Sequence, residues 1–312
     1  MNDIVINAKS LRKRYGSVAA VDGIDLSVRR GEIFGLLGPN GAGKTTTILM
    51  LLGLTEVSEG TIDIGGFDPM HDPLEVKRRV GYLPDSVGFY DGMTASENLR
   101  YTCRLAGFSR TDSDARIERA LARVGLSGVA SHKVGTFSRG MKQRLGLAEV
   151  LMKGAEVAIL DEPTSGLDPE ATFELLDMIR GMKSDGTAVL ISSHLLDRVQ
   201  AVCDRVALFN HGRIALEGTV PELAQRVLGG GYVYEVVADG ADIERTLAAV
   251  PGTQRVTKEG RLFRVLAERD IRADIARAVV AGGGNLLTLS DSAPSLDTVY
   301  RHYFEGQAHG TA

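Results

Sequence analysis

One stretch of the chain has the residue types and the spacing needed to hold the phosphates of a nucleotide. In GLLGPNGAGKTTT, four residues separate Gly38 from Gly43, and Lys44 and Thr45 follow directly. Glycines let backbone N–H groups wrap the phosphates, the lysine adds a fixed positive charge, and the threonine hydroxyl can ligate Mg²⁺. The alternative is a glycine-rich turn with a solvated lysine. The pattern favours a nucleotide site formed by Gly38, Pro39, Asn40, Gly41, Ala42, Gly43, Lys44, Thr45 and Thr46.

Two further groups that could act on a phosphate each follow an apolar stretch. VAILDE ends in Asp161 and Glu162, and LISSH ends in His194. We expect Asp161 to assist in holding Mg²⁺ and Glu162 to polarise the attacking water, because phosphoryl transfer needs an oriented nucleophile. His194 could bond a γ-phosphate oxygen or position the water. The alternatives are a solvated acid pair at a strand end and a structural histidine.

The stretch TFSRGMKQRLGLAEV predicts a second anion site in another part of the chain. Ser138 stands at the expected start of a helix, and a serine cap followed by backbone N–H groups is a place where phosphate binds readily. The alternative is an ordinary helix cap. The two interpretations are compatible, because the same donors serve both.

The elements expected around these residues form a mainly parallel α/β sheet. Short β-rich runs in the N-terminal part end in the strand, loop and helix of the phosphate site. A helical insert is expected from about residue 86 to 154, where Thr94 and Glu97 have capping-box spacing. EVAILDE, TAVLISSH and RVALFNHGRI are each interpreted as one strand, with helices from Pro169 to about Lys183 and from Leu195 to Cys203 between them.

A glycine-rich break at residues 228–231 separates this core from a second section. The pattern there is βαββαβ, the order of a ferredoxin-like domain, followed by a last helix in APSLDTVYRHYFEG. The predicted fold is α/β with a small C-terminal α+β domain, and the predicted domains are residues 1–227 and 232–312. The second domain has no cluster of His, Cys or acidic ligands. It is interpreted as a dimer brace, with a ligand sensor that gates the first domain as the alternative.

Composition and charge exclude several classes of protein. The 312 residues carry a formal net charge of −4, which gives no basic field of the kind that nucleic-acid binders show, so nucleic acid is not expected as a partner. Cys103 and Cys203 are far apart, so neither a disulfide framework nor a zinc site is expected. No stretch resembles a signal peptide or a membrane span, and a soluble protein in a reducing cytosol is expected.

These motifs, in this order, resemble those of the nucleotide-binding subunit of an ABC transporter, a P-loop NTPase with a helical subdomain, over residues 4–225. TFSRGMKQRLGLA resembles the signature sequence of the family, ILDEPTSGLDP its acid pair and D-loop, and ISSH its switch histidine. GYLPD is similar to the Q-loop, and RYGS to the segment whose aromatic residue, here Tyr15, stacks on adenine. The tail PSLDTVYRHYF resembles export-type subunits for drugs, natural products and polysaccharides, and GYLPDSVGFY is similar to subunits that serve assembly of a periplasmic copper site.

The resemblance implies a Mg²⁺-dependent ATPase that acts as a head-to-tail homodimer, in which the signature helix of one subunit binds the γ-phosphate of ATP held by the other. Catalysis would fall to Lys44, Glu162 and His194. The dimer would drive a separate transmembrane permease, reached through the helical insert and the Asp85 loop, at the cytoplasmic face of the membrane. Cross-dimer contacts would fall on Ser138, Arg139, Gly140 and Met141 of the signature and on Ser165 and Asp168 of the D-loop, and metal contacts on Thr45, Asp161 and Asp85.

Two places depart from the family pattern. Arg139, Gly140 and Met141 stand where Gly-Gly-Gln is usual, and Arg139 could touch phosphate, contact a partner subunit or be solvated. Asp85 replaces the usual Gln or Glu and is one methylene shorter than Glu, so a water could bridge it to Mg²⁺. A soluble ABC-type regulator acting on ribosomes or DNA is the alternative function, but the chain has neither a second cassette nor a long coiled-coil insertion.

Overall fold

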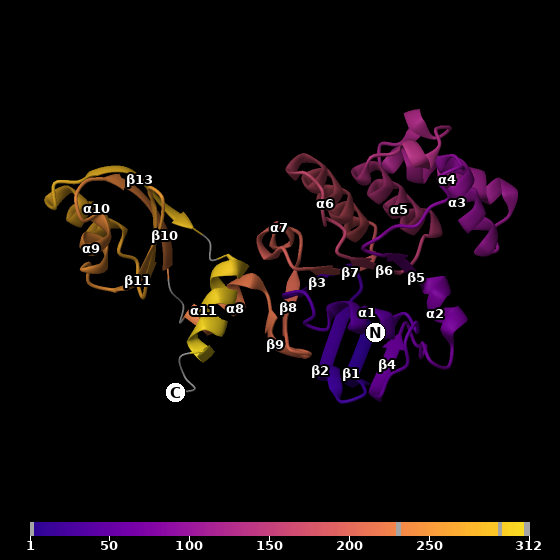
Figure 1. The fold of residues 1–312 in the computed structure, drawn as a ribbon, viewed down its shortest axis with the longest axis horizontal. Helices are drawn as coiled ribbons and strands as arrows, with labels where there is room; N and C mark the ends of the chain where they lie inside the picture. Colours follow the sequence, from indigo (N-terminus) through magenta and orange to yellow (C-terminus); the bar gives the residue numbers. More distant parts are fainter. Residues whose placement is uncertain (1–2, 229–231, 293–294, 309–312) are drawn as a thin grey trace. The chain divides into compact units, whose positions relative to one another are not determined.

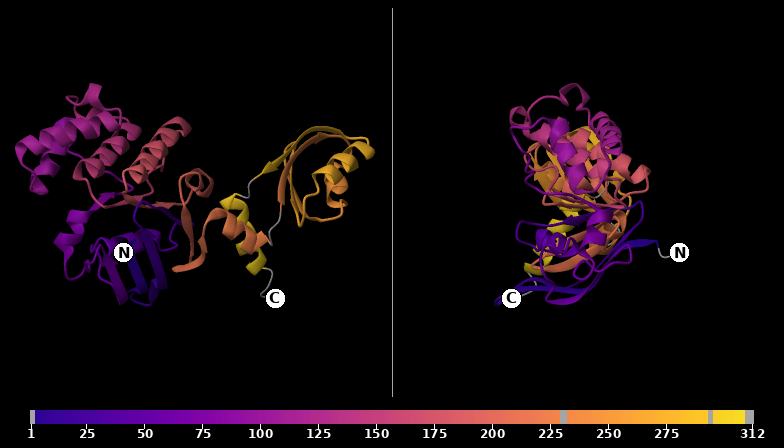
Figure 2. Two further views of the ribbon diagram at one scale, coloured as in Figure 1. Left: turned by 180° about the vertical axis from the view of Figure 1, so that it is seen from behind. Right: turned by 90° about the vertical axis from the view of Figure 1, so that its right-hand side faces the viewer.

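The computed structural model shows two compact units (Figures 1 and 2). The residues that it describes are 3–228, 232–292 and 295–308. The units are formed by residues 1–217 and 218–312. No helix within the described ranges is long and apolar enough to cross a bilayer.

The units divide earlier in the chain than the predicted domains do. The prediction ends the first domain at residue 227, whereas α8 (Val220–Leu228) belongs to the second unit, where it packs on α11 (Leu296–Ala308). α8 has an apolar face that includes the buried Leu223, and packing against another helix removes this face from water. Of the predicted glycine-rich break, residues 229–231 lie outside the described part of the chain.

The centre of the first unit is a six-stranded sheet in the order β5-β6-β7-β3-β8-β9. The pairs from β5 to β8 are parallel, so the predicted mainly parallel core is confirmed. β3, β6 and β7 are buried along their whole length, as is usual for strands of a parallel sheet that is covered on both faces. The strands are β3 (Ile33–Leu37), β5 (Val80–Leu83), β6 (Val157–Asp161), β7 (Ala188–Ser193), β8 (Arg205–Asn210) and β9 (Arg213–Gly218).

The prediction of one strand in RVALFNHGRI is wrong, because the chain turns in the middle of it. His211 and Gly212 separate β8 from β9 and have φ values of 46° and 77°. Positive φ at both central residues is typical of the tight two-residue turn between hairpin strands. The helix predicted from Leu195 to Cys203 is present but shorter, as α7 (Leu196–Gln200).

A three-stranded antiparallel sheet in the order β2-β1-β4 completes the core of the first unit. One apolar cluster joins the two sheets and α1, and it includes Leu26, Phe34 and Ile48. Burial of this apolar surface holds β3 and α1, the two elements that flank the phosphate loop. The elements are β1 (Ile4–Tyr15), β2 (Val18–Arg29), β4 (Glu59–Ile64) and α1 (Lys44–Leu51).

Helices α3, α4 and α5 form the predicted insert and group together beside the sheet (Figure 1). The capping box at Thr94 and Glu97 is confirmed, since each side chain accepts the backbone N–H of the other residue. Gly146 lets α5 lie close to β5, because a Cβ there would overlap the Leu83 side chain. The helices are α2 (Pro73–Arg79), α3 (Ala95–Leu105), α4 (Arg110–Arg123), α5 (Arg139–Lys153) and α6 (Pro169–Ser184), with 3₁₀ turns at Ser127–Val129 and Val134–Thr136.

The second unit contains a four-stranded antiparallel sheet in the order β11-β12-β10-β13. With α9 and α10 the element order is βαββαβ, which agrees with the predicted pattern. The sheet face with Tyr234 and Phe263 packs on Leu247 and Ile275 of the two helices. The elements are β10 (Tyr232–Asp239), α9 (Ile243–Ala248), β11 (Thr253–Glu259), β12 (Leu262–Ala267), α10 (Arg272–Ala281) and β13 (Asn285–Ser292).

Candidate functional site

The phosphate loop follows β3, whose last residue pairs with Ser193 at the end of β7. Gly43 precedes α1 with a φ of 110°. A Cβ at Gly43 would lie 2.6 Å from the carbonyl oxygen of Ala20, so both the backbone conformation and the available space require glycine. α1 begins at Lys44, so its free N–H groups and its partial positive charge lie beside the loop after β3 and the end of β6.

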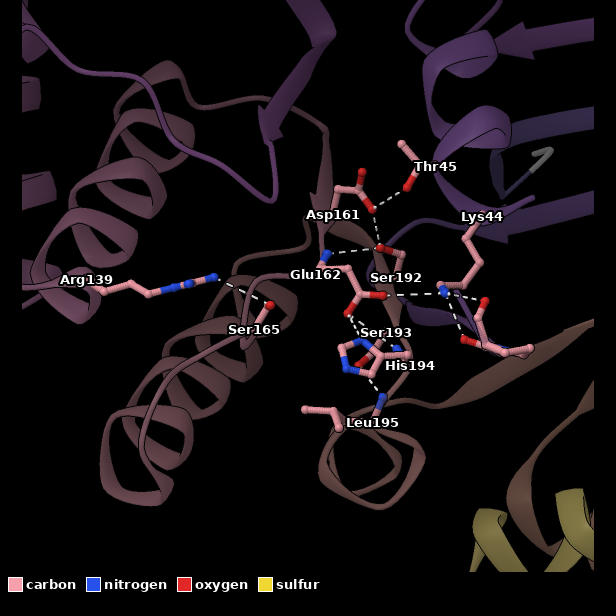
Figure 3. Close-up of polar contacts among 12 residues, drawn as sticks. Lys44, Thr45, Arg139, Asp161, Glu162, Ser165, Ser192, Ser193, His194 and Leu195 are labelled. Atoms are coloured by element: carbon pink, nitrogen blue, oxygen red, sulfur yellow. Dashed lines mark hydrogen bonds and ion pairs between the residues drawn. The ribbon is translucent and has the colours of Figure 1, made fainter. Parts of the chain in front are cut away.

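Lys44 is buried in this loop, with only 5% of its surface exposed. Its Nζ donates to the carbonyl oxygens of Gly38 at 2.7 Å and Pro39 at 3.1 Å, and lies 3.4 Å from Oε1 of Glu162 (Figure 3). A buried ammonium group needs such partners, because an unpaired buried charge is strongly destabilising. Charged phosphate oxygens are stronger acceptors than carbonyls, so a bound phosphate would take over these contacts.

Thr45 and Asp161 offer oxygen ligands at the same place. The Thr45 hydroxyl donates to Oδ1 of Asp161 at 3.4 Å, and the Ser192 hydroxyl donates to the same oxygen at 2.5 Å. Burial raises the pKa of the Asp161 carboxyl; the bond from Ser192 opposes this rise, and the nearby carboxylates of Glu162 and Asp85 add to it. A crowded, buried carboxylate beside a hydroxyl suits a hard cation such as Mg²⁺, which commonly keeps waters and phosphate oxygens among its ligands.

Glu162 stands between two of the predicted catalytic groups. While Oε1 faces Lys44, Oε2 lies 2.8 Å from Nδ1 of His194. Glu162 has a φ of 49°, a left-handed conformation that is uncommon outside glycine, and its N–H donates to the Ser192 hydroxyl at 3.0 Å. The structure thus brings Lys44, Glu162 and His194 together. One carboxylate oxygen of Glu162 faces the Lys44 ammonium, and the other faces the His194 imidazole.

Ser192 is a site residue that the sequence interpretation missed. Its hydroxyl joins the Asp161 carboxylate to the Glu162 backbone, because the parallel register places Asp161 beside Ser192. The signal in the sequence is the pair of serines that closes the apolar strand β7, Ser192 and Ser193, both fully buried. A buried hydroxyl has to find a hydrogen-bond partner, and at this strand end the partners are the acid pair.

We expect the substitution Ser192→Ala to lower the free energy of unfolding by about 1–3 kcal/mol, because it leaves polar groups of Asp161 and Glu162 without their partner. Urea denaturation followed by circular dichroism measures the change. Ser184→Ala is the control, since that exposed hydroxyl makes one long bond of 3.5 Å to the Arg180 carbonyl. Equal stability of the two variants would contradict the assigned role of Ser192.

The second predicted anion site lies at the N-terminus of α5. Ser138 caps the helix, and its hydroxyl accepts the N–H of Met141 at 3.2 Å, so the helix-cap interpretation is confirmed. Ser138 and Arg139 are exposed, and the first turn has no acidic side chain. Figure 3 shows Arg139 apart from Lys44 and Glu162, so this helix end and the phosphate loop are separate features of the chain.

The loop after Glu162 connects the acid pair with α6. The N–H of Ser165 donates to the carbonyl of Glu162 at 3.0 Å, and its hydroxyl accepts from Arg139 at 3.5 Å. Asp168 caps α6 by accepting the N–H of Ala171 at 2.8 Å, as the sequence predicts. The loop therefore links the residues at the end of β6 to the start of α5 and α6.

Known proteins resemble this chain over most of its length. The family model described as ABC transporter matches residues 21–165. The linearmycin resistance ATP-binding protein LnrL of Bacillus subtilis is 32% identical over 308 residues, which cover 95% of this chain and 97% of that protein. The chain belongs to the ABC transporter ATP-binding proteins. It is an ATPase that serves as the ATP-binding subunit of a transporter.

Two further comparisons support this assignment. The doxorubicin resistance ATP-binding protein DrrA of Mycobacterium tuberculosis is 34% identical over 317 residues, covering 96% of this chain and 93% of that protein. A solved structure of the ATP binding subunit of an ABC transporter is 31% identical, with a TM-score of 0.66 over 72% of this chain and 94% of that one. The predicted ABC ATPase fold is confirmed, and the transporter interpretation is favoured over that of a soluble regulator.

Two residues assigned from the ABC pattern form neither a hydrogen bond nor an ion pair with the phosphate loop in the part of the chain that the structure describes. Tyr15 is 52% exposed as a residue, its hydroxyl lies 3.5 Å from that of Thr55, and the Lys13 ammonium lies 4.9 Å from the ring centroid. Asp85 is exposed, and its charge contributes to the raised pKa of the Asp161 carboxyl. Adenine stacking by Tyr15 and metal contact by Asp85 stay predictions.

Proposed function

We propose that two copies of this ABC ATPase close head to tail on two ATP molecules, so that the α5 N-terminus of one copy contacts the γ-phosphate held by the other. The supporting observation is that the exposed cap at Ser138 begins a helix whose first turn has no acidic side chain, in a place apart from the Lys44 loop. One loop and one such helix end in each chain would form two composite sites in a dimer. The helix dipole and the backbone N–H groups favour the phosphate charge.

In this proposal, hydrolysis follows from the contacts around Glu162. When ATP phosphates take over the contacts of Lys44, Oε1 of Glu162 is released from the ammonium group and can accept a proton from a water placed against the γ-phosphate. His194, at 2.8 Å from the other carboxylate oxygen, orients Glu162 and can bond a phosphate oxygen. Mg²⁺, held through Thr45 and Asp161, would neutralise the charge that develops on the phosphates.

We further propose that the ATPase drives an exporter permease at the cytoplasmic face of a membrane. Relatives are named for resistance to linearmycin and doxorubicin, for bacitracin transport and for Nod factor export. A groove of about 900 Å³ lies beside the helical insert and suits an apolar segment of a permease, because Leu74 and Leu105 on its rim are 68% and 73% exposed. Its lining also includes Val76, Phe108, Glu149 and Lys153.

Light scattering of Glu162→Gln with and without Mg-ATP tests the dimer. We expect ATP to convert the monomer into a dimer, because slowed hydrolysis keeps the γ-phosphate contacts in place. Adding Ser138→Arg should abolish the dimer, since a bulky cation then fills the contact. Ser109→Arg is the matched control, because Ser109 is likewise an exposed serine cap, of α4. A dimer that survives Ser138→Arg, or that Ser109→Arg abolishes equally, would contradict the proposed arrangement.

A further inference from the structure

The side chain of Arg139, at the first position of α5, lies on the loop that follows Glu162 in the same chain (Figure 3). A Cβ built on Gly166 would come within 2.6 Å of Cζ, 2.7 Å of one terminal nitrogen and 3.0 Å of Nε of Arg139. The guanidinium group therefore covers Gly166, and any larger residue at this position would displace it. Gly166 also has a φ of 66°, so glycine is favoured here for two reasons.

The charge of Arg139 is poorly partnered in this position. Within the described ranges its guanidinium forms no ion pair, and its one hydrogen bond is the 3.5 Å contact with the neutral hydroxyl of Ser165. A cation at the first residue of a helix also faces the positive end of the helix dipole. The position of Arg139 is therefore explained by its packing on Gly166, and a stronger acceptor near α5 would compete for it.

The loop beneath Arg139 contains an unsatisfied group of its own. Thr164 is 1% exposed, and in the described part of the chain its hydroxyl has no hydrogen-bond partner. Buried hydroxyls are normally paired, so the unpaired Thr164 hydroxyl makes this conformation of the loop less stable than one in which the hydroxyl finds a partner. Ser165, the next residue, is tied by its N–H to the carbonyl of Glu162. A shift of Ser165 and Gly166 would therefore also move the backbone of Glu162, which is proposed to accept the proton of the attacking water.

We propose that Arg139 is a positioning residue that couples the phosphate site at the N-terminus of α5 to the Glu162 site of the same chain. With its guanidinium on Gly166, it holds the loop at residues 162–168. A phosphate bound at Ser138 offers Arg139 a charged, bidentate acceptor, draws the guanidinium off Gly166 and frees the loop. The inference rests on the proposed function, because the phosphate belongs to the ATP of a second copy.

Such coupling makes occupancy of one ATP site change hydrolysis at the other, so it is measurable as cooperativity. We expect the wild-type ATPase rate to depend on ATP concentration with a Hill coefficient above 1. Arg139→Ala should lower the Hill coefficient below the wild-type value, because ATP still pairs the two chains but the coupling through the loop is lost. Gly166→Ala should do the same by blocking the contact while leaving the arginine in place, and the double variant should show no further change, since both remove one interaction.

Two controls separate the coupling from general damage. Arg119→Ala removes an exposed arginine whose side chain, within the described ranges, bonds only to the carbonyl of Ala115 in its own helix. Gly186→Ala adds a Cβ at a φ of 84° where nothing lies within 4 Å. Both should keep the wild-type Hill coefficient. An unchanged, wild-type Hill coefficient in Arg139→Ala, or an additive loss in the double variant, overturns the inference.

The dimer experiment distinguishes a failure of this inference from a failure of the proposed function. If Glu162→Gln forms an ATP-dependent dimer but Arg139→Ala keeps the wild-type Hill coefficient, coupling through Arg139 is wrong and the dimer stands. If ATP produces no dimer in Glu162→Gln, the proposed head-to-tail arrangement is wrong, and the inference is overturned with it.

Discussion

Replacing Glu162 by Gln is expected to lower the maximal rate of ATP hydrolysis by about 100- to 10,000-fold, the range typical for loss of a general base. Gln keeps the shape of the side chain, but an amide cannot accept the proton of the attacking water. The Lys44 loop is unaltered, so ATP should still bind. Phosphate release at saturating Mg-ATP measures the rate, and titration with a fluorescent ATP analogue measures the affinity.

Glu156→Gln is the matched control for this prediction. Glu156 directly precedes β6, at the end opposite to Glu162, and its carboxylate pairs with Arg30 at 2.9 Å on an exposed surface. The same chemical change there should leave the hydrolysis rate unchanged, because exposed ion pairs contribute little. A near wild-type rate in Glu162→Gln would show that another group accepts the proton, and His194 would be the next to test.

The phosphate loop could be predicted from the sequence because its determinants are local. The glycines, Lys44 and Thr45 are close in the chain, and an apolar strand before them and a helix after them are visible as short patterns. The positions of Asp161 and His194 at strand ends could also be expected, since parallel strands end at one edge of their sheet. Local sequence patterns were therefore enough to predict most of the residues that surround Glu162.

Contacts that depend on register or on packing between elements could not be predicted in this way. Ser192 reaches both Asp161 and the Glu162 backbone only because β6 and β7 pair in one particular register. The interpretation of Arg139 stayed open between phosphate, partner and solvent, because no pattern in the sequence indicates that its guanidinium covers Gly166. The same limit explains the missed turn at residues 211–212, where two residues with positive φ interrupt an apolar run.

Replacing Gly43 by Ala is expected to weaken ATP binding by about 100-fold or more, since left-handed backbone alone costs a side-chain residue about 1–2 kcal/mol. The additional methyl group would lie 2.6 Å from the Ala20 carbonyl oxygen. Relief of this overlap has to move the start of α1, and with it Lys44 and Thr45, away from the phosphates. Equilibrium titration with a fluorescent ATP analogue measures the affinity.

Gly41→Ala separates the strain of the backbone from the overlap. Gly41 has a φ of 79°, and a Cβ at this position would have no atom within 4 Å. This variant therefore has the strained backbone conformation but no steric overlap. We expect it to weaken ATP binding only about 10-fold, in line with that cost. Thermal unfolding of both variants shows whether each remains folded. Equal affinities for Gly41→Ala and Gly43→Ala would mean that contact with Ala20 does not hold the loop, and that the backbone conformation alone makes the phosphate site depend on glycine.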